Sequence, residues 1–111
     1  MTKNKEPRTV FGQRLRYVRQ ARGMPQDRLG VAIGIDETAA GTRVSRYETG
    51  THEPPYETAL LIAKALGVEV AYFYADDECL AELILNWRSL SPLVQLQLLA
   101  KARKNVPKSS N

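Results

Sequence analysis

Residues 25–50 read PQDRLGVAIGIDETAAGTRVSRYETG, a stretch in which Pro25, Gly34 and Gly50 bound two segments. It begins at Pro25, a residue suited to the first turn of a helix, and apolar side chains then recur four residues apart up to Gly34. A second segment runs over about residues 36–48 and stops before Gly50, the residue type most common just past a helix C-terminus. The stretch therefore predicts two helices joined by a short turn.

Helical spacing of apolar residues continues on both sides of this pair. Three further helices are expected over residues 9–22, 54–66 and 70–74, the first of them capped by Thr9. Two more are expected after Asp76 and Asp77, and the second of these begins at Ser91 and Pro92. No segment alternates apolar and polar residues over the length of a strand. The sequence predicts an all-α protein with five helices followed by two.

Positive charge is concentrated near the N-terminus. The 111 residues carry a net charge of +4, and residues 1–30 hold eight Lys and Arg against the acids Glu6 and Asp27. A basic lobe of this size attracts phosphate, although a solvated helix face can have the same composition. Charge alone leaves nucleic-acid binding open.

Other classes of protein are disfavoured by what the sequence lacks. Cys79 is the one cysteine and His52 the one histidine, so neither an internal disulfide nor a zinc cluster is expected. No nucleophile–base set, paired-carboxylate site or phosphate-cradling glycine loop is evident, which argues against an enzyme. The apolar stretches are too short to cross a bilayer, and the N-terminus lacks the apolar core of a secretory signal. We expect a cytoplasmic protein with no catalytic residue, metal or cofactor.

The second helix of the pair has an apolar side and a polar side. On a helical wheel Ala40, Val44 and Tyr47 fall together and form a packing stripe. The opposite side carries Thr38, Thr42, Ser45, Arg46 and Thr49, with Arg43 and Ala39 at its edges. Such a face, free of acids, suits the approach of a helix to base edges in the major groove of DNA. The expected base contacts are Thr38, Thr42, Arg43, Ser45 and Arg46.

Arg46 is the first candidate because a guanidinium can donate to both O6 and N7 of guanine. Thr42 and Ser45 could bond base edges or touch a thymine methyl group, and Arg43 could reach a base or a phosphate. The alternatives are a phosphate contact or surface ion pair for Arg46, and a plain solvated surface for Thr42 and Ser45.

Four phrases occur in an order typical of one family: FGQRLRYVR at 11–19, MPQDRLGVAIGID at 24–36, VSRYETGTHEP at 44–54 and LIAKALGV at 61–68. Together they resemble the lambda-repressor-like (Xre or Cro-CI type) helix-turn-helix regulators over about residues 10–75. The resemblance implies a transcriptional regulator that binds duplex DNA sequence-specifically. It also implies phosphate contacts from Gln26, Thr51 and His52, to which Thr49 is added, and a structural ion pair between Arg19 and Glu48.

The sequence departs from the family in the turn of this motif. Seven residues separate Ile35 and Asp36 from Val44, where family members usually have about three. Four extra residues are close to one helical turn, so one long helix capped by Asp36 keeps its faces in phase. The alternative is an irregular loop through residues 38–41, and Gly41 costs the long helix about 1 kcal/mol relative to alanine. We expect the long helix, which adds Thr38 to the polar face.

The last two helices cannot form a core alone, so they are expected to pack on the first domain or on another chain. We expect homodimerisation through them, with capping of the monomer core as the alternative. The predicted organisation is a disordered basic arm over 1–8, a DNA-binding domain over 9–75, the helix pair over 76–105 and a disordered tail over 106–111.

The function expected from the sequence is regulation, most simply repression, at a two-fold operator without a small-molecule cofactor. A protein partner remains open. One rival is an antitoxin-type protein that neutralises a toxin through its C-terminal helices and represses its own operon. Another is a protein-binding helical module that has lost DNA binding, which the acid-free polar face disfavours.

Overall fold

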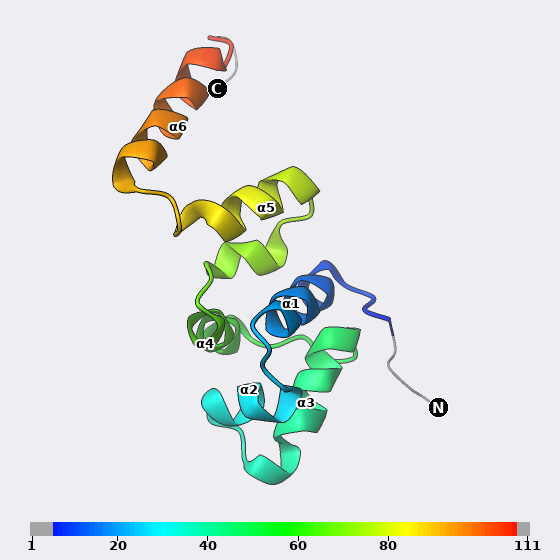
Figure 1. Cartoon of the computed structure of the whole chain (residues 1–111). Helices are drawn as coiled ribbons and strands as arrows, with labels where there is room; N and C mark the ends of the chain where they lie inside the picture. Colours follow the sequence, from blue (N-terminus) through cyan, green and yellow to red (C-terminus); the bar gives the residue numbers. More distant parts are fainter. Residues whose placement is uncertain (1–5, 109–111) are drawn as a thin grey trace.

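This computed structural model describes residues 6–108, which contain seven helices joined by turns and loops (Figure 1). They are α1 (Val10–Ala21), α2 (Gln26–Ala32), α3 (Glu37–Thr49), α4 (Tyr56–Leu66), the 3-10 helix η1 (Val70–Tyr74), α5 (Glu78–Trp87) and α6 (Pro92–Asn105). The described residues contain no strand, which confirms the predicted all-α fold of five helices followed by two. None of these helices is long and apolar enough to span a bilayer.

Side chains fix the first residues of four helices. The caps are Thr9 for α1, Asp36 for α3, Asp77 for α5 and Ser91 for α6, each accepting a hydrogen bond from a backbone amide of the first turn. Helix α2 begins one residue later than the sequence suggests, because Pro25 is extended and Gln26 is the first helical residue. Gly50 ends α3 with a φ of 86°, a conformation that favours glycine.

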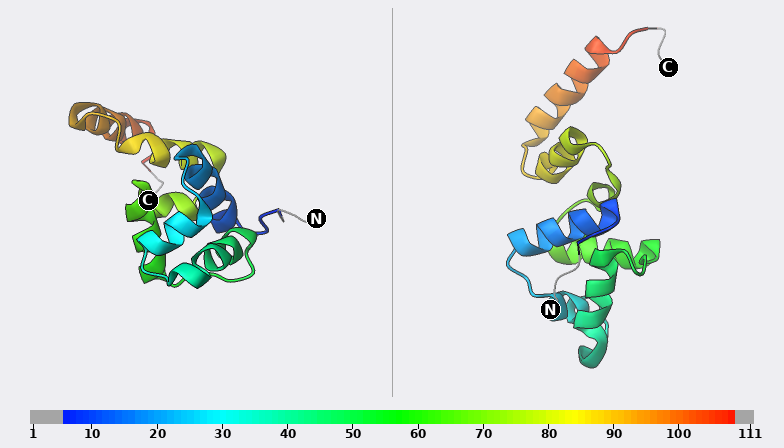
Figure 2. Two further views of the ribbon diagram at one scale, coloured as in Figure 1. Left: turned by 60° about the horizontal axis from the view of Figure 1, so that its bottom comes forward. Right: turned by 90° about the vertical axis from the view of Figure 1, so that its right-hand side faces the viewer.

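The core lies among the first five helices, which gather around α1 in both views of Figure 2. Its principal buried side chains are Phe11, Leu15, Val18, Leu29, Val44, Tyr47, Ile62, Leu66 and Phe73. Ala40, Val44 and Tyr47 are all buried, so the packing stripe predicted for α3 is confirmed. This stripe holds α3 from one side and leaves its other side to solvent.

The long form of α3 is confirmed, since the helix runs without interruption from Glu37 to Thr49. Small residues let its added turn approach α2. A Cβ placed on Gly30 would lie 2.5 Å from the Cβ of Ala40, so the α2 backbone lies almost in contact with α3 there. A Cβ on Gly41 would lie 3.6 Å or more from Asp27, an ordinary contact. The added turn is therefore packed on α2 through Gly30.

The expectation of a disordered arm over residues 1–8 is wrong at its last residue. Residues 1–5 lie outside the described residues, but the amide of Arg8 donates to the carbonyl of Thr49 at 3.2 Å and its Nε to the same oxygen at 3.4 Å. A cation is favourable at the C-terminal end of a helix. Arg8 is thus held against the last turn of α3. Of the predicted tail, residues 106–108 follow α6 without helical structure, and the rest lies outside the described residues.

The two C-terminal helices differ in how they meet the core. Ala81 of α5 is buried, and Ile84 and Leu85 pack against the core cluster. The buried guanidinium of Arg14 on α1 donates to the carbonyl of Ala75 at 2.9 and 3.0 Å, and to the carboxylate of Glu78 at 3.0 Å. Helix α5 is therefore fastened to the first five helices, as the capping alternative expected.

Helix α6 has no buried residue. It leads away from the other helices in Figures 1 and 2, and the described residues measure 53 Å along their longest axis against 26 and 23 Å along the others. Its first turn is held by a hydrogen bond from Gln95 Nε2 to the carbonyl of Trp87 at 2.8 Å. Of the two helices predicted over residues 76–105, α5 therefore packs on the core and α6 has no buried residue.

Candidate nucleic-acid interface

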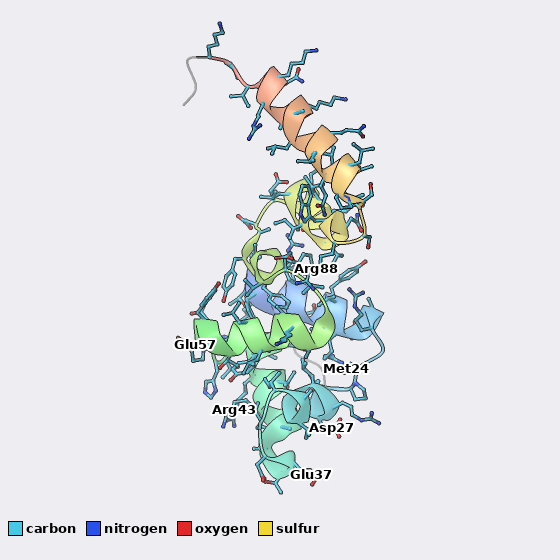
Figure 3. All side chains as sticks on the ribbon, turned by 90° about the vertical axis from the view of Figure 1, so that its left-hand side faces the viewer. Met24, Asp27, Glu37, Arg43, Glu57 and Arg88 are labelled. Carbon is cyan, nitrogen blue, oxygen red and sulfur yellow. The ribbon has the colours of Figure 1, made fainter. Side chains whose placement is uncertain are left out.

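The exposed side of α3 carries short polar and cationic side chains. Thr42, Arg43 and Arg46 are exposed and Ser45 is half-buried. In Figure 3, Arg43 lies on the side of α3 away from Asp27 of α2. No hydrogen bond or ion pair within the described residues engages the guanidinium of Arg43 or Arg46, so both are available to an external acceptor. The structure thus places four of the five predicted base contacts along one accessible side of α3.

Thr38, the fifth predicted base contact, is exposed in the added turn but is already bonded. Its backbone amide donates to Asp36 Oδ2 at 3.1 Å, and its hydroxyl donates to the same oxygen. The hydrogen bond from the Thr38 hydroxyl, followed by that from its amide, lowers the pKa of Asp36 below its ordinary value. Thr38 therefore helps to close the cap of α3, and donating to a base would require its hydroxyl to turn away from Asp36.

Thr49 differs from its expected position on the exposed polar side. It is buried, and its hydroxyl donates to the carbonyl of Arg46 at 3.3 Å and lies 2.9 Å from the hydroxyl of Thr51. With Arg8 on its carbonyl as well, Thr49 closes the end of α3. A direct phosphate contact from Thr49 would need these bonds to break. Thr51 and His52 are exposed in the loop that follows, where a phosphate could approach.

A buried carboxylate ties α3 to the two helices before it. Glu48 is fully buried and forms an ion pair with Arg19, which the family resemblance implied. Arg16, one helical turn before Arg19, contacts the same carboxylate at 3.2 Å, a partner that the sequence analysis missed. The three-residue spacing of two arginines on α1 was the available signal. Two cations therefore balance one buried carboxylate.

Gln26 is the third partner of Glu48. Its Nε2 donates to Glu48 Oε1 at 3.0 Å, and the residue is half-buried at the first position of α2. The predicted phosphate contact therefore has a competing intramolecular acceptor. The Gln26 side chain still lies beside α3, so the network sets the position of the whole α2–α3 pair.

Residues 6–108 contain no group of three His, Cys, Asp or Glu side chains that could hold a metal ion.

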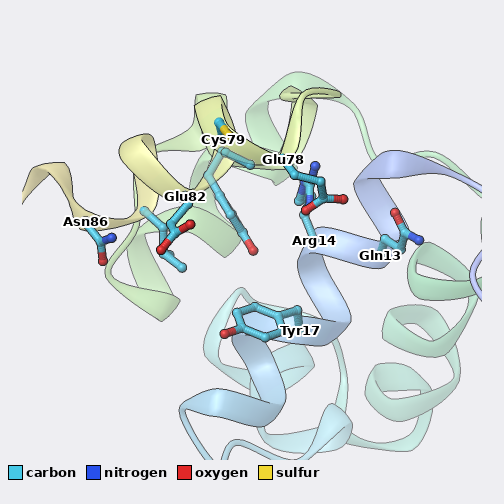
Figure 4. Close-up of a pocket in the computed structure, with 10 residues that line it drawn as sticks. Gln13, Arg14, Tyr17, Glu78, Cys79, Glu82 and Asn86 are labelled. Atoms are coloured by element: carbon cyan, nitrogen blue, oxygen red, sulfur yellow. The ribbon is translucent and has the colours of Figure 1, made fainter.

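A hollow between α1 and α5 is lined by Gln13, Arg14, Tyr17, Glu78, Cys79 and Glu82, among others (Figure 4). Tyr72 also lines this hollow, and burial raises its pKa, although the nearby Arg14 partly opposes the shift.

Known proteins are similar to this chain in sequence and in fold. Residues 15–73, which span the helix-turn-helix and its neighbours, match the helix-turn-helix family. The chain is 38% identical over 65 residues to the HTH-type transcriptional regulator y4wC of Sinorhizobium fredii, covering 59% of this chain and 43% of that protein. It therefore spans less than half of that relative's length.

A solved structure is similar over most of the chain. The crystal structure of the transcriptional regulator BswR superposes with a TM-score of 0.78 at 36% identity, covering 84% of this chain and 92% of that one. At this level of identity the likeness extends beyond the fold to the sequence that builds it. The chain belongs to the lambda-repressor-like (Xre-type) helix-turn-helix family of transcriptional regulators.

Proposed function

We propose that this protein is a sequence-specific repressor that binds duplex DNA as a homodimer, with α3 of each copy in the major groove of one half-site. The observation that carries the proposal is the contrast between the two sides of α3. One side is locked by Val44, Tyr47 and the buried Glu48, and the other presents the unengaged guanidiniums of Arg43 and Arg46. A rigid helix with a polar, acid-free outer side can follow the floor of the groove.

Different side chains take different parts in this complex. Arg46 donates to O6 and N7 of a guanine, and Thr42 and Ser45 contact the neighbouring bases. Arg43 contacts a base or phosphate at the edge of the groove. Thr51 and His52 lie in the loop after α3 and contact phosphate, which fixes the register of the helix without reading sequence.

Two copies are needed because one α3 covers a single half-site. A dimer with a two-fold axis presents two such helices about 34 Å apart, one turn of DNA. An operator so occupied is closed to other proteins, which makes repression the simplest outcome. We place this activity in the cytoplasm and assign it no cofactor.

In vitro selection from random duplexes, repeated at low and high salt, tests the proposal. We expect enrichment of a two-fold-symmetric sequence, because base contacts persist when salt weakens the phosphate contacts common to all DNA. If all duplexes were retained equally at low salt and none at high salt, the protein would bind DNA through its phosphates without recognising the base sequence. That result would overturn the proposal.

The exposed apolar side chains of α6 favour one second candidate, an antitoxin-type protein whose C-terminal helix binds and neutralises a toxin. Leu93 and Leu96 are about two-thirds exposed. Co-expression with a neighbouring small gene, followed by purification, distinguishes the candidates. A stable complex that relieves toxicity supports the antitoxin, and a lone homodimer supports the simple repressor.

A further inference from the structure

The hollow between α1 and α5 has the size of a small-ligand site. Its volume is about 590 Å³, within the range of pockets that bind small molecules. Arg14, Tyr72 and Ala81 are buried where they line it. Figure 4 shows Tyr17 of α1 and Glu82 of α5 on facing walls. The hollow therefore combines buried residues with exposed polar residues from two helices.

The hydroxyl of Tyr72 is a buried polar group without a partner in the chain. Tyr72 is 3% exposed and lines the hollow, yet no hydrogen bond within residues 6–108 engages its hydroxyl. The guanidinium carbon of Arg14 lies 5.9 Å from the centre of the Tyr72 ring, but its nitrogens donate elsewhere. A buried polar group that lacks a hydrogen bond lowers stability. A partner for this hydroxyl can come from the hollow that Tyr72 lines.

The charge of the hollow favours a cation. Its charged lining residues are Arg14, Glu78 and Glu82. Every nitrogen of the Arg14 guanidinium donates within the chain, to two backbone carbonyls and to the carboxylate of Glu78. Glu82 is exposed and forms no ion pair within the described part of the chain. A cation therefore finds a carboxylate without a partner, whereas an anion meets a guanidinium that is already bonded.

Aromatic and aliphatic side chains line other parts of the hollow. The side chain of Tyr17 is 59% exposed on α1, and Ala81 and Leu85 contribute apolar surface from α5. An exposed aromatic ring can stack on a flat ligand and attract a nearby cation. These walls suit a flat apolar body between a cationic end and the hydroxyl of Tyr72.

We propose that this hollow binds a small aromatic amine that carries a hydroxyl group at the end opposite its ammonium. The ammonium pairs with Glu82, the ring packs between Tyr17 and Leu85, and the hydroxyl forms a hydrogen bond with that of Tyr72. Burial raises the pKa of Tyr72, so its hydroxyl stays protonated and can donate as well as accept. Each part of the ligand meets a group that the chain leaves without a partner.

The site lies on the side of α1 away from the helix-turn-helix. Arg14 and Tyr17 line the hollow, whereas Arg16 and Arg19 contact Glu48 of α3. On a helical wheel these two pairs point in nearly opposite directions. Ligand binding is therefore a further activity, which does not rest on the proposed function.

Calorimetric titration of the full-length protein with tyramine tests the proposal, because tyramine has a hydroxyl opposite its ammonium. Phenethylamine lacks that hydroxyl, and 4-hydroxyphenylacetate has a carboxylate in place of the ammonium. We expect tyramine to saturate the protein and phenethylamine to bind about fivefold more weakly, because one hydrogen bond is lost. The anion should not saturate it up to about 10 mM. Failure of tyramine to saturate by that concentration, or equal binding of the anion, would overturn the proposal.

Tyr72→Phe tests the hydroxyl contact. The substitution removes a group with no partner in the chain, so the protein should keep its stability. We expect tyramine to bind about fivefold more weakly and phenethylamine to bind as before, so that the preference between the two amines disappears. Tyr74→Phe, on the same helix η1 but outside the lining, is the matched control and should keep the preference. A preference that survives Tyr72→Phe would contradict the proposed site.

Glu82→Gln tests the charged contact. Both amines should bind about threefold more weakly at low salt, and the difference should shrink at high salt because Glu82 is exposed. Glu57→Gln, on the exposed side of α4, is the matched control and should bind both amines like the original protein. Equal weakening by the two substitutions, or none by either, would assign the ammonium to another place and overturn the proposal.

Backbone amide chemical shifts locate the bound ligand. Saturating tyramine should move the resonances of residues 13–17 and 78–86 and leave those of residues 42–46 in place. Shifts confined to residues outside the first two ranges would contradict the site. A protein that selects a symmetric operator but does not bind tyramine keeps the proposed function and loses this inference. Saturable binding in the hollow by a protein that selects no DNA sequence gives the reverse result.

Discussion

The carboxylate of Glu48, at the end of α3, lies fully buried against the guanidinium of Arg19 on α1. Arg16 and Gln26 complete its surroundings, so one side chain joins the first three helices. Removing one member of a buried ion pair leaves a charge without its partner. The position of α3 therefore depends on a carboxylate that is buried and not exposed to solvent.

Glu48→Gln should lower the free energy of unfolding by about 3 kcal/mol, because Arg16 and Arg19 would keep their charges in a mostly buried site without a counterion. Urea unfolding followed by circular dichroism measures the change. Glu57→Gln, on the exposed side of α4, is the control and should stay within about 0.5 kcal/mol. A loss at Glu48 no larger than at Glu57 would mean that the network does not hold α3.

Gly30→Ala and Gly41→Ala should act in opposite directions. A Cβ on Gly30 would meet Ala40 at 2.5 Å, so α2 and α3 must move apart and stability should fall by about 2 kcal/mol. Gly41 lies inside α3 with room for a methyl group, and alanine there should add about 0.5–1 kcal/mol. Thermal unfolding of the two variants gives the sign of each change. Stabilisation by both would mean that the added turn of α3 is not packed on α2.

The added turn of α3 should loosen in acid. Hydrogen bonds from Thr38 lower the pKa of Asp36 in the folded protein, so the charged cap contributes stability that is complete above the ordinary carboxyl pKa of about 3.9. That contribution is lost as pH falls through the lower pKa of the folded state. Backbone chemical shifts of residues 37–40 should move toward non-helical values over this range.

Asp36→Asn is the matched control for the acid response, since asparagine caps a helix without titrating. Its shifts for residues 37–40 should stay near helical values over the same range. A response identical to that of the original protein would show that another group controls the turn.

Gln26→Ala should weaken binding to all duplexes by a similar factor, about fivefold, because a phosphate contact carries no sequence information. The same substitution removes the bond to Glu48, so stability must be measured beside affinity. Fluorescence anisotropy on an operator and on an unrelated duplex gives the two affinities. A change in the ratio between them would assign Gln26 a part in base reading.

The length of α3 could be predicted because it depends on local facts: four extra residues make about one turn, and Asp36 can cap a helix. The burial of Thr49 could not, because a helical wheel gives angles and says nothing of what lies beyond the end of the helix. Arg8 and Thr51 close that end, and their positions depend on the whole fold.

The same limit applies to the C-terminal helices. The spacing of their apolar residues predicted both helices correctly. The spacing does not tell which other helix the apolar side of each one packs against. Ala81 is buried against the core whereas Leu96 is 64% exposed, although both lie on apolar stripes. The ion pair from Arg14 to Glu78, which fastens α5, joins residues too far apart in sequence for any periodic pattern to reveal.

Binding of Arg46→Ala to systematic single-base variants of the selected operator shows whether the exposed side of α3 reads bases. We predict a loss of about 1–3 kcal/mol on the best operator and relaxed preference at one position per half-site, with preferences elsewhere unchanged. Lys64→Ala, an exposed cation on α4, is the control and should leave every preference intact. An equal loss on every sequence would make Arg46 a phosphate contact and contradict base reading by this side of α3.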